Sequence, residues 1–318
     1  MIKKIIFLIT LLAFIGCNKG DDDHETNVFI GDVILRTQTS VDNFGYLGYD
    51  EIKGSLHIGG NLQNNTSIKN IDKLSSIKKV SSIIIEYNDN LTNIDGLSNL
   101  TSVDTLMISF NSSLENIKGL VSLTNTEKTI IDIFHNPSLE SLKGLNNIQS
   151  VDELYISGNA IKSLDGLENL NYAGNLYINS ERIINLEGLN NLKQANYLHI
   201  FGNDFLETLE GLNQLSILGD RGLWVRQNFN LVNINGLEGL VNINGPLQIL
   251  ENYILKNIDG LENLEYVSKI NIAYNSDLNN FCGMKLLINN NFEVWYSIRY
   301  NLYNPNIEDI KNGNCSLQ

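Results

Sequence analysis

The sequence is poor in several residues that would point to a particular class of protein. It has 3 prolines, 3 cysteines and 4 histidines among 318 residues. So few prolines, in a chain that is 42% hydrophobic, argue against a disordered or linker-dominated protein. The histidines stand in no metal-binding or hydrolase motif, and the sequence has no glycine-rich phosphate loop. We therefore expect neither an enzyme nor a protein with a bound cofactor or metal.

Positive charge is also scarce. The chain has 22 lysines and arginines against 36 acidic residues, which gives a formal net charge of −14. A polyanion repels nucleic acid and anionic lipid, so we expect neither as a partner. The acidity can equally serve solubility alone, because a net charge far from zero keeps proteins apart.

A segment long enough to span a membrane is missing, although the N-terminus is apolar. Two lysines precede an apolar run at residues 5–15, which is too short to cross a bilayer and suits a signal peptide. The run ends in Phe14-Ile15-Gly16-Cys17, which resembles the lipobox of bacterial lipoproteins, with Phe14 where leucine is usual. The resemblance implies that residues 1–16 are removed and that Cys17 is lipidated. A plain secretory signal with an incidental cysteine is the alternative.

The next segment, residues 17–27, contains three consecutive aspartates. It is similar to the acidic stretches that send lipoproteins of Bacteroidota to the outer face of the outer membrane. This similarity implies a lipidated tether, a contact with the membrane through lipid only, and a chain that faces the cell exterior. A charge run can also be no more than a solvated spacer.

An internal repeat is the strongest feature that the sequence does have. Gly-Leu recurs every 22 to 25 residues, at Gly96, Gly119, Gly144, Gly166, Gly188, Gly211, Gly236 and Gly260. In step with it recurs apolar-x-apolar-x-x-Asn, which ends at Asn61, Asn88, Asn111, Asn136, Asn159, Asn203, Asn228, Asn252, Asn275 and Asn301. One repeat has Glu181 in place of the asparagine. Counting it, the sequence predicts about eleven turns.

The spacing within one repeat indicates a coil. Its apolar residues are Leu139, Leu142, Leu145, Ile148, Val151, Leu154 and Ile156. A step of three would wind these residues around the whole surface of an α-helix, whereas a flattened coil can turn each of them inward. The last step, of two residues, is the alternation of a short strand. We expect the recurrent asparagine to satisfy backbone groups and the recurrent glycine to permit a tight bend.

Leu154-Tyr155-Ile156-Ser157-Gly158-Asn159 and the Leu164-to-Leu170 segment resemble the leucine-rich-repeat superfamily, and more narrowly its receptor L-domain-like proteins. The resemblance covers about residues 28–318 and implies a right-handed, parallel β-solenoid of 22–27-residue turns. It places the repeats at residues 54–279, between an N-terminal cap at 28–53 and a C-terminal cap at 280–318. It does not identify a ligand, because this fold serves many partners.

Cys282 and Cys315 lie in the predicted C-terminal cap. Members of the family close in a similar way, with a cysteine pair around a Tyr-Asn-Pro segment, here at residues 303–305. In an exported protein such a pair is expected to form a disulfide. No histidine lies near either cysteine, which disfavours a zinc site.

Function is expected on the strand residues that lie between core positions, because stacking aligns them in outward columns. One column carries four flat rings in succession, and three more candidate binding residues lie beside it. The seven are Tyr155, Tyr177, Tyr197, His199, Phe201, Trp224 and Arg226. Aromatic rings with arginine are typical of binding hot spots, although aromatic residues also simply favour strands. We expect a monomer that binds a protein in adhesion or interaction. The alternative is a glycan-binding lipoprotein for nutrient capture.

Overall fold

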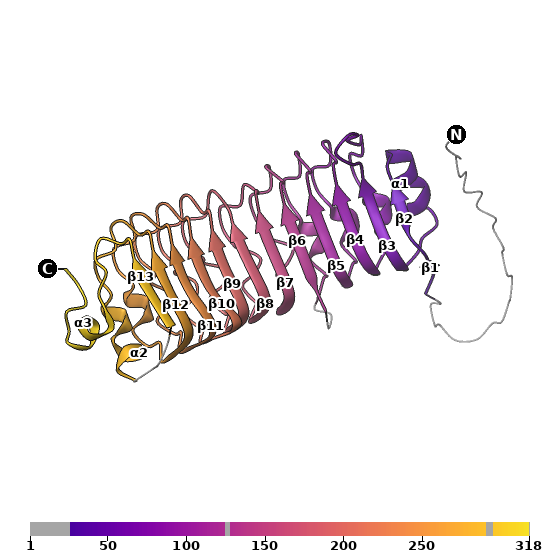
Figure 1. Ribbon diagram of the computed structural model, residues 1–318. Helices are drawn as coiled ribbons and strands as arrows, with labels where there is room; N and C mark the ends of the chain where they lie inside the picture. Colours follow the sequence, from indigo (N-terminus) through magenta and orange to yellow (C-terminus); the bar gives the residue numbers. More distant parts are fainter. Residues whose placement is uncertain (1–25, 125–127, 291–294, 318) are drawn as a thin grey trace, which may run out of the picture.

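The computed structural model describes residues 26–124, 128–290 and 295–317. Cys17, the predicted signal peptide and most of the predicted tether lie outside these residues. Figure 1 shows an elongated coil in which each turn adds one strand to a single sheet. The strands of the successive turns are β3 (Glu51–Gly59), β4 (Lys79–Glu86), β5 (Ser102–Ser109), β6 (Ile130–Phe134), β7 (Ser150–Ser157), β8 (Tyr172–Asn179), β9 (Gln194–Phe201), β10 (Ile217–Arg226), β11 (Asn242–Leu250), β12 (Tyr266–Ala273) and β13 (Trp295–Arg299).

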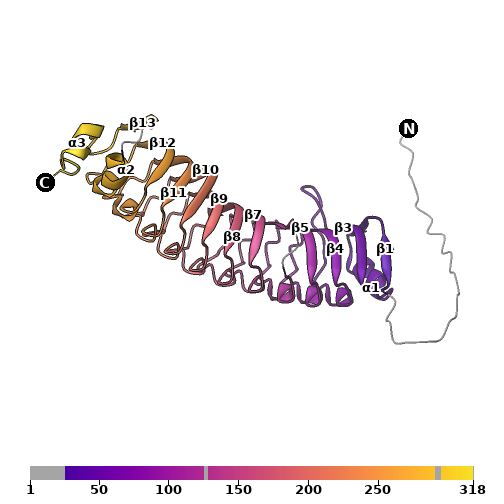
Figure 2. The same cartoon turned by 90° about the horizontal axis from the view of Figure 1, so that it is seen from below.

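The sheet follows the order of the chain. β3 to β13 are neighbours in sequence order, and each pairs in parallel with the next. The prediction of a parallel coil with about eleven turns is confirmed. Figure 2 shows the coil bending gently toward the side of the strands, so that the sheet forms its inner face.

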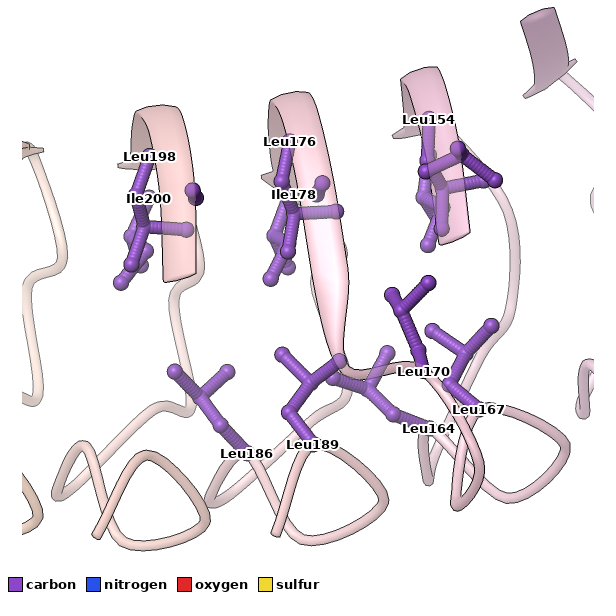
Figure 3. Close-up of a cluster of buried hydrophobic side chains, with 14 of the residues drawn as sticks. Leu154, Leu164, Leu167, Leu170, Leu176, Ile178, Leu186, Leu189, Leu198 and Ile200 are labelled. Carbon is purple, nitrogen blue, oxygen red and sulfur yellow. The ribbon is translucent and has the colours of Figure 1, made fainter. Parts of the chain in front are cut away.

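The core consists of the residues predicted from the three-residue step. All seven apolar residues of the turn from Leu139 to Ile156 are buried. Figure 3 shows the next turns, in which Leu167 and Leu170 lie opposite the strand residue Leu154, and Leu189 lies opposite Leu176 and Ile178. Each buried leucine or isoleucine contributes about 1.5–3 kcal/mol, whereas ordering one residue of backbone costs about 1–2 kcal/mol. One turn is therefore unstable by itself and depends on its neighbours.

The recurrent asparagines form a buried ladder along the coil. In each step the Asn side-chain amide donates to a backbone carbonyl of the preceding turn, and in all but Asn159 and Asn301 also to one of its own turn. Asn228 Nδ2, for example, lies 3.1 Å from both Ile200 O and Arg226 O. The ladder runs from Asn88 to Asn159 and again from Asn203 to Asn301. Between these runs Ser180, not Glu181, takes the position, and its backbone N–H donates to Asn203 Oδ1. The structural role expected for these residues is confirmed for the nine from Asn88 to Asn301. It is wrong for Asn61, which is exposed and lies outside the ladder.

The recurrent glycines are structural for a reason that differs in part from the expected one. Five of the eight have a positive φ, as a tight bend requires, but Gly96, Gly119 and Gly260 do not. At all eight, an added Cβ would overlap the carbonyl oxygen of a residue in the preceding turn, such as Ile71 for Gly96. The shared requirement is close approach of two turns. Where φ is not positive, the segments are short 3-10 helices: η2 (Asp95–Leu97), η3 (Lys118–Leu120) and η4 (Asp259–Leu261).

The N-terminal end is covered by two short strands and a helix. β1 (Val28–Ile30) and β2 (Val33–Leu35) both pair with β3, and α1 (Gln38–Gly45) follows. These elements lie within the range predicted as the N-terminal cap, but α1, in which only Val41 is buried, was not predicted from the sequence. β3 begins at Glu51, so it crosses the predicted boundary between cap and repeats.

The C-terminal end is held by the predicted cysteine pair. Cys282 and Cys315 lie at disulfide-bonding distance, with their Cα atoms 5.0 Å apart. They join η5 (Cys282–Met284) to the segment after α3 (Ile307–Lys311), while α2 (Lys285–Asn289) follows η5 directly. β13 lies inside the range predicted as cap, yet it continues the sheet. Within the described residues, no helix is long and apolar enough to cross a membrane.

Candidate functional site

The strand register places the predicted column side by side. Tyr155, Tyr177, His199 and Trp224 are aligned partners on the consecutive strands β7 to β10. Their ring centroids are 5.6 Å apart between Tyr155 and Tyr177, 6.1 Å between Tyr177 and His199, and 5.6 Å between His199 and Trp224. All three contacts are edge-on, which is a favoured geometry for aromatic pairs. We call these four residues the aromatic stripe.

The other three predicted residues are joined to the stripe. Tyr197 contacts Tyr177 at 5.3 Å and Trp224 at 5.8 Å between ring centroids. Phe201 is stacked on His199 at 4.4 Å. The Arg226 guanidinium lies 5.7 Å from the Trp224 ring and 5.9 Å from the Phe201 ring. The structure therefore brings all seven candidates into one cluster.

The cluster is less exposed than an outward-facing column suggests. His199 is only 6% exposed and Tyr197 only 4%, whereas Tyr155, Tyr177 and Trp224 are half-buried. Neighbouring rings enclose His199, and the guanidinium of Arg221 lies 4.3 Å from the centroid of the Tyr197 ring. The stripe is a packed layer on the sheet, and its rings are held in place before any partner arrives.

Arg221 was missed by the sequence analysis. It comes from an irregularity in β10, where the register with β9 shifts between Leu218 and Gly222. Its Nη1 donates to Asn175 Oδ1 of β8 at 3.0 Å, so the side chain crosses over β9. A signal existed in the sequence: four residues separate Leu218 from Leu223, whereas two separate the corresponding core residues in β7 to β9.

Several polar atoms on this face are enclosed and lack a hydrogen-bond partner within the described residues. They are Ser109 Oγ, Asp132 Oδ1, His199 Nε2, Trp224 Nε1, Arg226 Nε and Asn271 Oδ1. Buried polar atoms are nearly always paired, so this concentration on one face needs an explanation. A binding partner that supplies the missing hydrogen bonds would provide one.

Burial and charge shift the pKa values of three groups on the face. Burial, with Arg226 and Arg221 nearby, lowers the pKa of His199 to about 4, so its ring is neutral at pH 7. Burial raises the pKa of Tyr197, and the adjacent Tyr177 adds to the effect. Burial and then the nearby Glu153 raise the pKa of Asp132.

A second aromatic cluster lies at the sheet edge, just past the ends of three strands. Tyr87 and Phe110 are stacked at 4.8 Å, and Phe110 and His135 at 4.9 Å. All three have φ of 54° and immediately precede an asparagine of the ladder. Beside them is a groove of about 430 Å³, also lined by Leu62, Asn65, Asp89, Ser112, Pro137 and Gly158. This cluster was not predicted from the sequence, although an aromatic residue or histidine precedes the asparagine in three consecutive repeats.

No group of three or more histidine, cysteine, aspartate or glutamate side chains in the described part of the chain could hold a metal ion. Compared with models of known families and with curated proteins, the sequence matches none of them. Function therefore has to be inferred from the sheet face and from the sequence itself.

Proposed function

We propose that this protein is a lipid-anchored binding module that holds a protein partner on its sheet face. It would be a right-handed solenoid of the receptor L-domain-like, leucine-rich-repeat type, displayed on the outside of a bacterial outer membrane. The parallel coil and the repeat asparagines support the repeat type. The lipobox-like segment before Cys17 supports the anchor.

The aromatic stripe carries the proposal of protein binding. Binding hot spots are enriched in tryptophan, tyrosine and arginine, and all three meet here on adjacent strands. The rings already contact one another, so little side-chain freedom is lost when a partner packs on them. The enclosed donors Trp224 Nε1 and Arg226 Nε have no acceptor in the described part of the chain.

The test is selection of a displayed peptide library on the immobilised protein. A Tyr177→Ala, Trp224→Ala double variant is the comparison, and circular dichroism checks that it keeps its fold. Each hot-spot truncation costs about 2 kcal/mol or more, so peptides selected on the natural protein should lose most of their binding.

A matched control removes two aromatic residues elsewhere. Phe229 and Tyr253 are stacked at 5.5 Å, are well exposed and lie outside the strands. A Phe229→Ala, Tyr253→Ala variant should bind the selected peptides as the natural protein does. If the stripe variant binds them equally well, the sheet face is not the binding surface.

The edge groove favours a second candidate function, binding of a glycan for nutrient capture. Its aromatic rings lie beside Asp89, whose carboxylate accepts from Asn65 and Ser112, a mixture that suits an apolar and hydroxyl-rich ligand. A glycan array tests this candidate. Binding that is lost in Phe110→Ala and kept in the stripe variant would assign the glycan to the groove.

The proposed anchor is tested by Cys17→Ser. The variant should leave the membrane fraction and should not incorporate a palmitate analogue, because the cysteine thiol is the acceptor of the lipid. Unchanged partitioning into membranes would contradict the lipid anchor while leaving the binding surface unaffected.

A further inference from the structure

Charge is unevenly distributed along the sheet face. Four cationic side chains lie on its C-terminal half: Arg221, Arg226, Lys269 and Arg299, on β10, β12 and β13. They include three of the five arginines of a protein with a net charge of −14. The carboxylates in the outward columns, Glu86, Asp132 and Glu153, lie on β4, β6 and β7. Two further carboxylates border the cationic half: Asp220 next to Arg221, and Glu251, which accepts from Gln227 at 2.7 Å.

These cations contact aromatic rings rather than carboxylates. Besides Arg221 over Tyr197 and Arg226 beside Trp224, the Lys269 ammonium lies 4.0 Å from the Trp295 ring. The Arg299 guanidinium lies 5.9 Å from the ring of Tyr300. None of the four forms an ion pair within the described residues, where five pairs occur elsewhere. A ring attracts a cation without neutralising it, so the charges remain available to a partner.

Donors without acceptors lie in the same place. Trp224 Nε1 and Arg226 Nε can only donate, and both are enclosed and unpaired among the described residues. His199 is 6% exposed, and the unpaired Nε2 of its neutral ring can donate or accept. Asn271 Oδ1 on β12 is the one unpaired acceptor of this kind in the described part of β9 to β13. Unneutralised cations together with unsatisfied donors select for a ligand that carries acceptors and negative charge.

We propose that this surface binds an extended acidic segment, rich in aspartate and glutamate, of the protein partner. We call it the cationic patch, and it consists of Arg221, Arg226, Trp224, Lys269, Trp295 and Arg299. The inference rests on the proposed function, because it names the chemistry of the partner held by the sheet face.

The dimensions and composition of the patch favour a polypeptide. From β10 to β13 it spans about 14 Å at the usual strand spacing, which matches about four residues of extended chain. The planar guanidinium groups can each receive a carboxylate through two parallel hydrogen bonds. Both tryptophans of the protein lie here, and Trp295 is 55% exposed. Tryptophan beside a cationic side chain, as in the pairs Trp224–Arg226 and Trp295–Lys269, is typical of a protein-binding hot spot.

The experiment begins with the peptides selected on the natural protein. They should carry more aspartate and glutamate than the starting library, and their binding should weaken as salt is raised. In titrations with the selected peptides, the triple variant with Arg221→Gln, Arg226→Gln and Arg299→Gln should lose about tenfold or more in affinity. The control variant Lys118→Gln, Lys193→Gln, Lys256→Gln removes the same charge from exposed residues outside the strands, and its affinity should stay within about twofold. Circular dichroism checks the fold of both.

The outcomes separate this inference from the proposed function. Selected peptides that need the aromatic stripe, but have no acidic excess and bind the arginine variant normally, would overturn the cationic patch alone. Equal losses in the arginine variant and the lysine control would reduce the effect to net charge and overturn it too. If dextran sulfate binds through the three arginines and acidic peptides do not, the partner is an anionic polysaccharide and the inference is wrong. Peptides indifferent to the stripe would contradict the proposed function itself.

Discussion

The side-chain oxygen of Asn228 accepts two hydrogen bonds from Asn203, one turn earlier: from its backbone N–H at 3.2 Å and from its side-chain amide at 2.8 Å. Asn228 repeats the relationship with Asn252. The amide group thus serves two turns at once, because it donates to carbonyls of both and accepts from the preceding asparagine. A side chain without both a donor and an acceptor on the same short group cannot do this.

Asn228→Ala should therefore be strongly destabilising. Asn228 is fully buried, and its removal leaves the carbonyls of Ile200 and Arg226 and the N–H of Asn203 without these partners. We expect a loss of about 3–5 kcal/mol in the free energy of unfolding, measured by urea denaturation. Asn263→Ala removes a single exposed bond to Glu238 O and should cost less than about 1 kcal/mol. Similar losses in the free energy of unfolding for both variants would show that the asparagine ladder adds little to stability.

Substitution of a Gly-Leu glycine separates close approach from backbone strain. Gly96 has an ordinary φ, but an added Cβ would overlap Ile71 O, whereas Gly48 has φ of 63° and open space around it. Gly48→Ala should cost about 1 kcal/mol from strain alone. Gly96→Ala should cost more, about 1–3 kcal/mol or above, because two backbones must separate. Thermal unfolding of the two variants measures both losses of stability. A smaller loss for Gly96→Ala than for Gly48→Ala would contradict the close-approach explanation.

Loss of the cysteine pair should act on the C-terminal cap. Cys282→Ser, Cys315→Ser opens a loop with a sequence separation of 33 residues and should cost about 3–4 kcal/mol. Because each turn contacts mainly its neighbours, we expect faster hydrogen exchange from η5 onward and unchanged exchange in β4 to β8. Reduction of the natural protein should reproduce the effect and separates loss of the bond from the burial of serine. Uniform destabilisation of the whole coil would contradict a local role.

The neutral, enclosed His199 should make stability depend on pH. Its pKa is about 4 in the folded protein, against an ordinary value of 6.5, so between these values the unfolded chain binds a proton that the folded chain does not. Stability is therefore fully present above about pH 6.5 and is lost as the pH falls toward 4, by about 1–3 kcal/mol. In urea titrations, His199→Gln should remove this part of the slope, and His135→Gln should keep it. Parallel curves for the natural protein and His199→Gln would contradict the expectation.

The site could be predicted as far as local periodicity determines it. Because strand side chains alternate, the offset of Tyr155, Tyr177, His199 and Trp224 within their repeats was enough to place them side by side. Their burial was not predictable in this way, since it depends on side chains that arrive from other turns. Arg221 shows this best, because it reaches Tyr197 only through the irregular register of β10.

The sequence by itself determined the coil, its period and its core positions. These features repeat in every turn, so the residues of a single turn are enough to predict them. Only the tertiary structure decided why Gly96 must be a glycine, that Ser180 replaces an asparagine in the ladder, and that cations gather on one half of the sheet. Each of these depends on atoms that the coil brings together from residues about one turn or more apart, where a short window of sequence contains only one of the partners.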